Sequence, residues 1–278
     1  MLNTQELIVE ALTDELDRFY QLSWGLQEPE LPSIARWAAR MALSIISNSD
    51  ALYHDTDHSA KVTLVGQEIL RGKQLIDGGV TPSDWLNFTV ALVCHDIGYV
   101  RGLCEGDEPG HYVTGKGGER VDIHPGATDA ALTPYHVDRG ACFVRERFKD
   151  NRFIDAERVA SFIERTRFPV PAEDDSQRTD DYPGLLRAAD LIGQLGDPGY
   201  LRKLAALFYE FEETGVNQHL GYENPHDLRT GYPKFYWKAV HPYLSDAMRY
   251  LNATTDGRIW VHHLQSQVFD VEHNLYRR

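Results

Sequence analysis

The sequence lacks long hydrophobic runs and a cysteine framework. No run approaches the roughly 18 apolar residues that a membrane-spanning helix needs, so we expect no membrane association. The chain of 278 residues has only three cysteines, Cys94, Cys104 and Cys142. An odd number without a metal-like pair argues against a disulfide framework and fits a reducing compartment. Acidic residues interrupt the apolar pattern of the first 20 residues, which predicts a helix rather than a signal peptide, and the cytoplasm is the expected location.

Positive charge is also in short supply. The 28 Lys and Arg residues stand against 42 Asp and Glu residues, a net charge of −14. An acidic surface repels phosphate backbones, so we expect no polymeric nucleic acid as a partner. A small anionic substrate remains compatible, because a bound divalent cation can reverse the local field.

Helical periodicity is the dominant pattern, and strand signals are weak. Hydrophobic residues make up 42% of the chain, which is ordinary for a globular protein. We expect an all-α protein with at most a minor hairpin, forming a single domain over residues 1–278. Its metal-site core would span about residues 50–215, with helical extensions in 1–49 and 216–278. Residues 98–133 lack a clear period, and we expect this irregular segment to cover the mouth of a site.

One of the three His-Asp dipeptides lies where burial is expected. His95-Asp96 directly follows the apolar run FTVALVC, whereas His54-Asp55 and His226-Asp227 do not end such a helix. Burying two ionisable side chains costs several kcal/mol unless they are paired or bind a metal. Taken alone, the dipeptide is also compatible with a hydrogen-bonded core histidine beside a helix end.

Further ligand-type side chains occur on other predicted helices. His54 and His58 are four residues apart, so they share one helix face. Asp190 lies within the apolar helix LLRAADLIGQL. Imidazoles and carboxylates from three buried helices predict an octahedral nitrogen and oxygen site with open positions.

The order of histidine, histidine-aspartate and a distant aspartate resembles the HD superfamily of metal-dependent phosphohydrolases. The stretch YHDTDH is similar to the YHNxxH motif of the class I cyclic-nucleotide phosphodiesterases and departs from it at Asp55. IERTRFPVP and LLRAADLIGQL also resemble segments of those enzymes, and the likeness extends from Tyr53 to Gly196. It implies an HD-type helical bundle.

The resemblance implies one or two divalent ions, with Mg, Mn, Fe, Zn, Ni and Co not distinguished. The expected ligands are His58, His95, Asp96 and Asp190, and Asp96 would be the bridge if a second ion binds. His124, in the irregular segment, is either an ordinary loop residue or a further ligand.

The resemblance also implies catalytic roles. His54 would be the general acid, with Asp55 or Asp57 as candidates for orienting it. His136, in YHVDRG, falls where the family has another active-site histidine; the alternative is a helix-start histidine bonded to a loop. Lys61 is expected either to contact phosphate or to lie in solvent. Three loop cations are further candidates for substrate contacts: Arg101, Lys116 and Arg120.

Three functions follow as hypotheses. The first is a hydrolase of a small phosphate ester, either a phosphodiester or a nucleotide. The second is an HD-type di-iron oxygenase, which uses extra histidines between the HD pair and the last aspartate; His111, His124 and His136 leave it open. The third is a non-catalytic ligand-binding HD domain. The substrate stays open, and a homodimer is compatible with the sequence.

Overall fold

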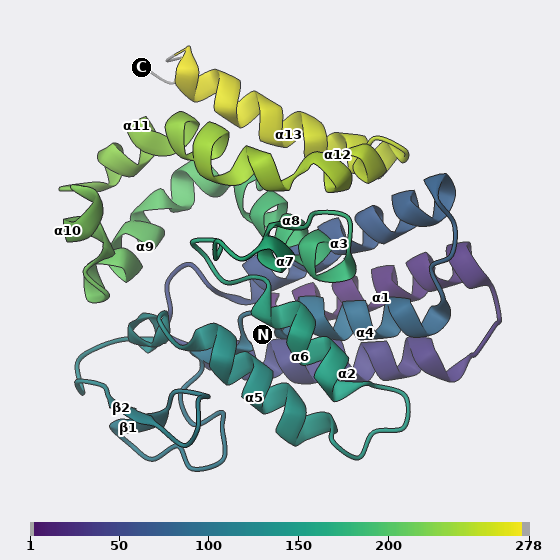
Figure 1. Ribbon diagram of the computed structural model, residues 1–278, viewed down its shortest axis with the longest axis horizontal. Coiled ribbons are helices and arrows are strands. Elements are labelled where there is room, and N and C mark those ends of the chain that lie inside the picture. Colours follow the sequence, from purple (N-terminus) through teal and green to yellow (C-terminus); the bar gives the residue numbers. More distant parts are fainter. Residues whose placement is uncertain (1–2, 274–278) are drawn as a thin grey trace.

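The structure is a computed structural model that describes residues 3–273, and over this range the protein is all-α, as predicted (Figure 1). The α-helices of the first half are α1 (Thr4–Trp24), α2 (Glu30–Ile46), α3 (Thr56–Ile76), α4 (Pro82–Cys94), α5 (His136–Phe148) and α6 (Ala156–Glu164). Those of the second half are α7 (Asp174–Gln177), α8 (Tyr182–Leu195), α9 (Tyr200–Glu213), α10 (Val216–Leu220), α11 (Pro225–Phe235), α12 (Ser245–Leu251) and α13 (Thr255–Glu272). Short 3-10 or π turns are η1 (Ile97–Tyr99), η2 (Asp129–Leu132), η3 (Tyr236–Val240) and η4 (His241–Tyr243).

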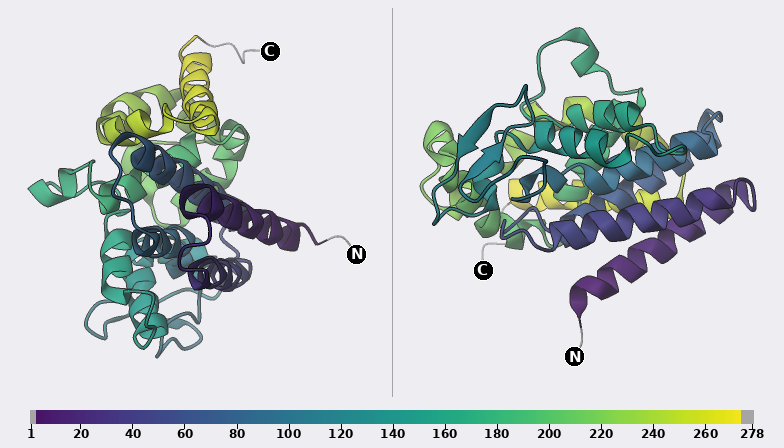
Figure 2. Two further views of the ribbon diagram at one scale, coloured as in Figure 1. Left: turned by 90° about the vertical axis from the view of Figure 1, so that its right-hand side faces the viewer. Right: turned by 90° about the horizontal axis from the view of Figure 1, so that it is seen from below.

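Helix α3 is the central element of the molecule. It packs against α1, α4, α8 and α12. Its outer neighbours α1 and α2 form an antiparallel pair, and α11–α13 lie on the opposite side of the molecule (Figures 1 and 2). A Cβ atom added at Gly193 of α8 would lie 2.8 Å from the Cα atom of Val62 in α3, so glycine permits this close approach.

Two N-terminal caps set the helices that carry the site. Asp55 caps α3, because its side chain accepts a hydrogen bond from the His58 backbone N–H at 2.9 Å. Thr81 and Asp84 form a capping box at the start of α4, with Pro82 in the first turn. Helix α4 is buried from Trp85 to Cys94, and His95 and Asp96 follow at its C-terminal end as predicted.

The irregular segment contains a small antiparallel hairpin, β1 (His111–Val113) and β2 (Arg120–Asp122). Arg139 of α5 holds this segment from inside: its guanidinium donates to Asp107 Oδ2 at 2.9 Å and to the Gly98 carbonyl at 2.8 Å. Both side chains of this ion pair are almost fully buried. The irregular segment is therefore packed against α5.

Apolar side chains from α1 to α13 belong to one contiguous cluster, from Leu12 to Val268. The sequence predicts no membrane-spanning helix. Within residues 3–273, no helix combines the length and the apolar character needed to cross a membrane.

Candidate metal centre

Four of the expected ligands converge where α3, α4 and α8 meet. His58 Nε2 lies 3.2 Å from Asp96 Oδ2 and 3.4 Å from Asp190 Oδ1. His95 Nε2 lies 3.0 Å and 3.5 Å from the same two oxygens. Ligand atoms of His58, His95 and Asp190 all lie within 4.8 Å of one another, so this group could hold a metal ion.

Local structure points these atoms at a common centre. His95 donates from Nδ1 to the Leu92 carbonyl at 2.8 Å, which leaves Nε2 as the nitrogen facing the carboxylates. His95 Nε2 and Asp96 Oδ2 are buried and have no hydrogen-bond partner. Leaving a buried polar atom unpaired costs about 1–3 kcal/mol, and a cation between them would satisfy both. The residues therefore fit a divalent ion that accepts nitrogen and oxygen ligands.

Two of the four side chains in the group are carboxylates, and a cation would offset their negative charge. Burial raises the pKa of Asp190, but the close approach of His58 and His95 outweighs burial and lowers the pKa to about 2. Burial likewise raises the pKa of Asp96, and the same two imidazoles bring it well below its ordinary value. Both carboxylates are therefore ionised at neutral pH and available as ligands.

His54 lies beside this group and is fixed by a residue that the sequence did not indicate. Its Nδ1 donates to Glu210 Oε2 of α9 at 2.6 Å, and its ring centroid lies 5.6 Å from that of His58. Burial lowers the pKa of His54, but the charge and hydrogen bond of Glu210 outweigh it and raise the pKa to about 9. The expectation that Asp55 or Asp57 orients His54 is wrong, because Asp55 caps α3 and Asp57 pairs with lysines.

His136 reaches the centre from the start of α5. Its Nδ1 donates to the Thr133 carbonyl at 2.6 Å, and its Nε2 lies 3.8 Å from Asp96 Oδ1. The ring of Tyr99 lies between the rings of His136 and His54 and is stacked on both. The structure thus brings His136 to the metal centre on the side of the second Asp96 oxygen.

Lys61 was expected either to contact phosphate or to lie in solvent, but its side chain forms ion pairs with carboxylates. Its Nζ is 2.7 Å from Asp57 and 2.9 Å from Asp197, and Lys203 of α9 pairs with the same two carboxylates. These ion pairs join α3 to α9. Lys61 is therefore engaged in helix packing, which corrects its assignment as a catalytic residue.

The loop cations proposed for substrate contacts are also paired with carboxylates. The pairs are Arg101 with Asp50 and Asp129, Lys116 with Asp138, and Arg120 with Glu108. The excess of acidic residues supplies these partners.

His124 is not brought to the metal centre. It lies exposed after the hairpin, where its Nδ1 accepts a hydrogen bond from the Gly126 backbone N–H at 3.0 Å. His111 is also exposed and lies 2.6 Å from Asp122 across the hairpin. The hairpin directs both histidines toward solvent, so the ligand assignment of His124 is corrected.

Two residues at the site were missed by sequence reasoning, Glu210 and Tyr99. Glu210 occurs three residues after Leu207, within the apolar stripe of α9, and an acid in such a stripe is a usable signal. Tyr99 follows the HDIG stretch directly, but an aromatic residue there is equally expected in the core.

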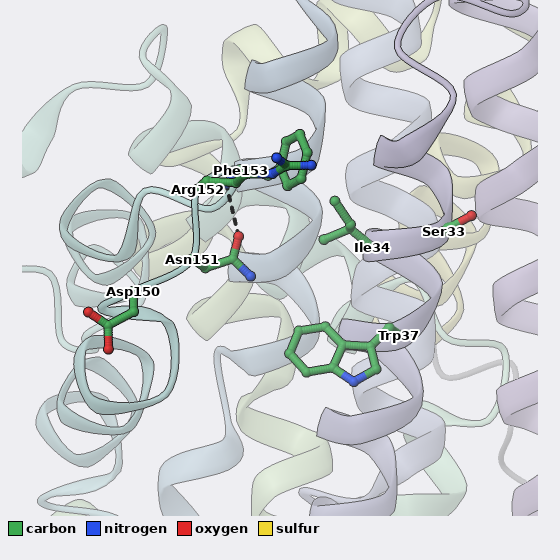
Figure 3. Close-up of a pocket in the computed structure, with 7 residues that line it drawn as sticks. All are labelled: Ser33, Ile34, Trp37, Asp150, Asn151, Arg152 and Phe153. Atoms are coloured by element: carbon green, nitrogen blue, oxygen red, sulfur yellow. Dashed lines mark hydrogen bonds between the residues drawn. The ribbon is translucent and has the colours of Figure 1, made fainter.

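A separate open groove lies on α2 and the connection between α5 and α6. In Figure 3, Trp37 and Ile34 face Asn151 and Phe153 across it. It contains none of the residues of the metal centre.

Comparison with known proteins adds a family assignment. No curated protein matches the chain. A family model described as Npun_R2479-like matches residues 2–274. Because this match covers nearly the whole chain, the protein belongs to the Npun_R2479-like family.

Proposed function

We propose that this protein is an HD-type, metal-dependent hydrolase of a small phosphate ester, either a phosphodiester or a nucleotide. One observation carries the proposal: four ligand-type side chains converge beside His54, a histidine held by a buried carboxylate. A ligand cluster alone would suit a structural ion. The adjacent His54–Glu210 pair adds a proton donor, which hydrolysis of a poor leaving group requires.

His58, His95, Asp96 and Asp190 would hold the ion, which can be Mg, Mn, Fe, Zn, Ni or Co. When bound, it would generate a nucleophile from water at neutral pH and neutralise charge on the phosphoryl group. The two oxygens of Asp96 face different histidines, Oδ2 toward His58 and His95 and Oδ1 toward His136. If a second ion binds, Asp96 would contribute to holding both ions.

His54 would protonate the leaving oxygen. Glu210 occupies its Nδ1, so Nε2 is the nitrogen available for the transfer. The pKa of about 9 keeps His54 protonated at neutral pH. General acid catalysis of this kind contributes about 10²–10⁴-fold to the rate.

The surrounding ion pairs favour a small substrate. The cations proposed for phosphate contacts are each paired with a carboxylate, so the phosphoryl charge would meet the bound ion and the histidines. A long polyanion would need many unpaired cations to neutralise its backbone.

The central test is the variant His54→Ala. It should retain the metal and lose roughly 10²-fold or more in turnover of an ester with a poor leaving group. The loss in turnover should be smaller with a nitrophenyl phosphate ester, because the nitrophenolate leaving group departs without a proton. Loss of the metal, or an equal rate loss on both substrates, would reject the role of His54.

The ligand assignment has its own test. Asp96→Ala should lose metal and turnover together, because Asp96 contacts both His58 and His95. Full metal content with normal turnover in this variant would show that the assignment is wrong.

The di-iron oxygenase hypothesis receives less support. It needs extra histidine ligands, and of His111, His124 and His136 the structure brings only His136 to the centre. Hydrolysis with redox-inert Mg or Zn restored would separate the two activities, since an oxygenase requires redox-active iron. Hydrolysis would equally exclude a domain that only binds a ligand.

A further inference from the structure

Three aromatic rings form a continuous stack beside the metal centre. The centroids of Tyr99 and His54 are 4.5 Å apart with an interplanar angle of 16°. Those of Tyr99 and His136 are 4.4 Å apart with an angle of 19°. Tyr99 is only 2% exposed, so both faces of its ring are used by the two imidazoles.

The backbone around Tyr99 is shaped to allow this stack. Tyr99 ends η1, the short turn that follows Asp96. At the preceding position, a Cβ atom on Gly98 would lie 1.8 Å from the His136 carbonyl oxygen. Only glycine lets η1 approach the start of α5 this closely, and that approach brings the His136 ring onto Tyr99.

Hydrogen bonds fix the two imidazoles of the stack, each at one edge. His54 is held at Nδ1 by Glu210, and His136 is held at Nδ1 by the Thr133 carbonyl. A single hydrogen bond leaves an imidazole free to swing about the bond axis, and a ring packed against its face removes that freedom.

We infer that Tyr99 is a positioning residue, whose ring sets the planes of His54 and His136 beside the metal centre. The inference rests on the proposed function, because the planes matter only if His54 delivers a proton. Tyr99 is not one of the four proposed ligands. It acts through the two histidines. The stacking of its ring, not its hydroxyl group, sets their orientation.

The test compares Tyr99→Leu with Tyr99→Phe. The leucine variant should fold and keep its metal but lose roughly 10- to 100-fold in kcat, the scale on which small misplacements of a reacting group act. The phenylalanine variant keeps the stack and should stay near the wild-type rate. Tyr20→Leu, a buried tyrosine of α1, is the matched control and should leave kcat unchanged.

A double-mutant cycle separates positioning from a general structural effect. In the background of His54→Ala, Tyr99→Leu should cause a much smaller further loss, because only His136 remains of the two histidines that Tyr99 positions. An equal loss in both backgrounds would overturn the inference. Wild-type turnover in Tyr99→Leu, loss of its metal, or an equal loss in Tyr99→Phe would also overturn it.

A spectroscopic measurement keeps this test distinct from that of the proposed function. The ring current of Tyr99 should displace the imidazole proton resonances of His54 and His136, and Tyr99→Leu should move both whereas Tyr99→Phe should not. If these shifts appear but wild-type protein hydrolyses no ester with any metal, the proposed function fails while the stack stands. If neither Tyr99→Leu nor Tyr99→Met folds, Tyr99 supports the fold rather than the histidines, and the inference fails.

Discussion

The pair of His54 and Glu210 joins residues that are 156 positions apart. Glu210 is 2% exposed, and its Oε1 also accepts hydrogen bonds from the backbone N–H groups of Tyr53 and His54. Burial raises the pKa of Glu210, but the charge and hydrogen bond of His54 outweigh this and lower it. Glu210 is therefore ionised and stabilises the imidazolium form of its partner.

Glu210→Gln keeps the shape of the side chain and removes its charge. We expect the metal content to stay normal and kcat to fall roughly 10²-fold, the lower end of what a general acid contributes. Without the carboxylate the pKa of His54 falls from about 9, so the alkaline limb of kcat should move to lower pH. Glu213→Gln, at an exposed position of the same helix, is the control. If Glu210→Gln left both kcat and the alkaline limb of its pH profile unchanged, the His54–Glu210 pair would have no role in catalysis.

Lys61 gives a second prediction for a single residue. Because its Nζ is paired with Asp57 and Asp197, Lys61→Met should leave KM for a phosphate ester unchanged. It should lower the free energy of unfolding by about 1 kcal/mol, since Lys203 still neutralises the two acids. Urea titration and steady-state kinetics on one preparation measure both. A large rise in KM with unchanged stability would restore the role in binding phosphate.

Residues placed by local helix geometry could be predicted from the sequence, and residues placed by helix packing could not. The position of His95-Asp96 at the end of α4 depends on local helix geometry, and the structure places this pair as expected. The expectation that His54 and His58 share one helix face is wrong, because α3 begins at Thr56 and His54 lies in the bend before it. The partner of His54 depends on how α9 packs against α3, which no local pattern encodes. Lys61 was misassigned partly for the same reason, because its partner Asp197 is distant in sequence. Its other partner, Asp57, lies four residues earlier in α3, a spacing at which helical ion pairs form.

Among whole elements, the start of α4 was predictable because Thr81, Pro82 and Asp84 interact within one turn. The packing of the irregular segment against α5 could not be predicted from the sequence. It depends on a buried arginine of α5 that bonds to Asp107 and to carbonyls of the segment. Arg139 appears in the sequence as one more charge in YHVDRG, with nothing to show that it is buried.

Asp107→Asn tests this anchor through its pH dependence. At neutral pH the variant leaves Arg139 buried without a counter-ion, which should cost about 3–5 kcal/mol of unfolding free energy. Burial raises the pKa of Asp107, but Arg139 outweighs it and holds the pKa below the ordinary 3.8. The stabilisation is therefore fully present above about pH 4 and is lost as the pH falls through the lower folded pKa.

Urea unfolding of both proteins between pH 7 and pH 3 measures this difference. We expect a constant gap between wild type and Asp107→Asn above about pH 4 and a narrowing gap below it. A gap that stays constant down to pH 3, or widens, would show that Asp107 is not the residue that stabilises the anchor.

For the whole molecule, the metal centre connects parts of the chain that are far apart in sequence. The proposed ligands come from α3, the end of α4 and α8, and Glu210 from α9 adjoins them. All these residues fall within the stretch of about residues 50–215 expected from the sequence to form the core. Because the helices pack in one apolar cluster, an ion that holds their ends should stabilise the folded protein as a unit.

Adding the correct divalent ion to metal-free protein should therefore raise Tm. At a free ion concentration 100 times Kd the gain is about 2.7 kcal/mol. For a chain of this size, each kcal/mol shifts Tm by roughly 2–4 °C. Asp190→Asn removes a ligand charge and should lose most of the shift, whereas His124→Ala should keep it, because His124 lies exposed in the irregular segment. Differential scanning calorimetry with and without each ion gives the comparison. A full shift in Asp190→Asn, or its loss in His124→Ala, would move the metal centre away from α8 and toward the irregular segment.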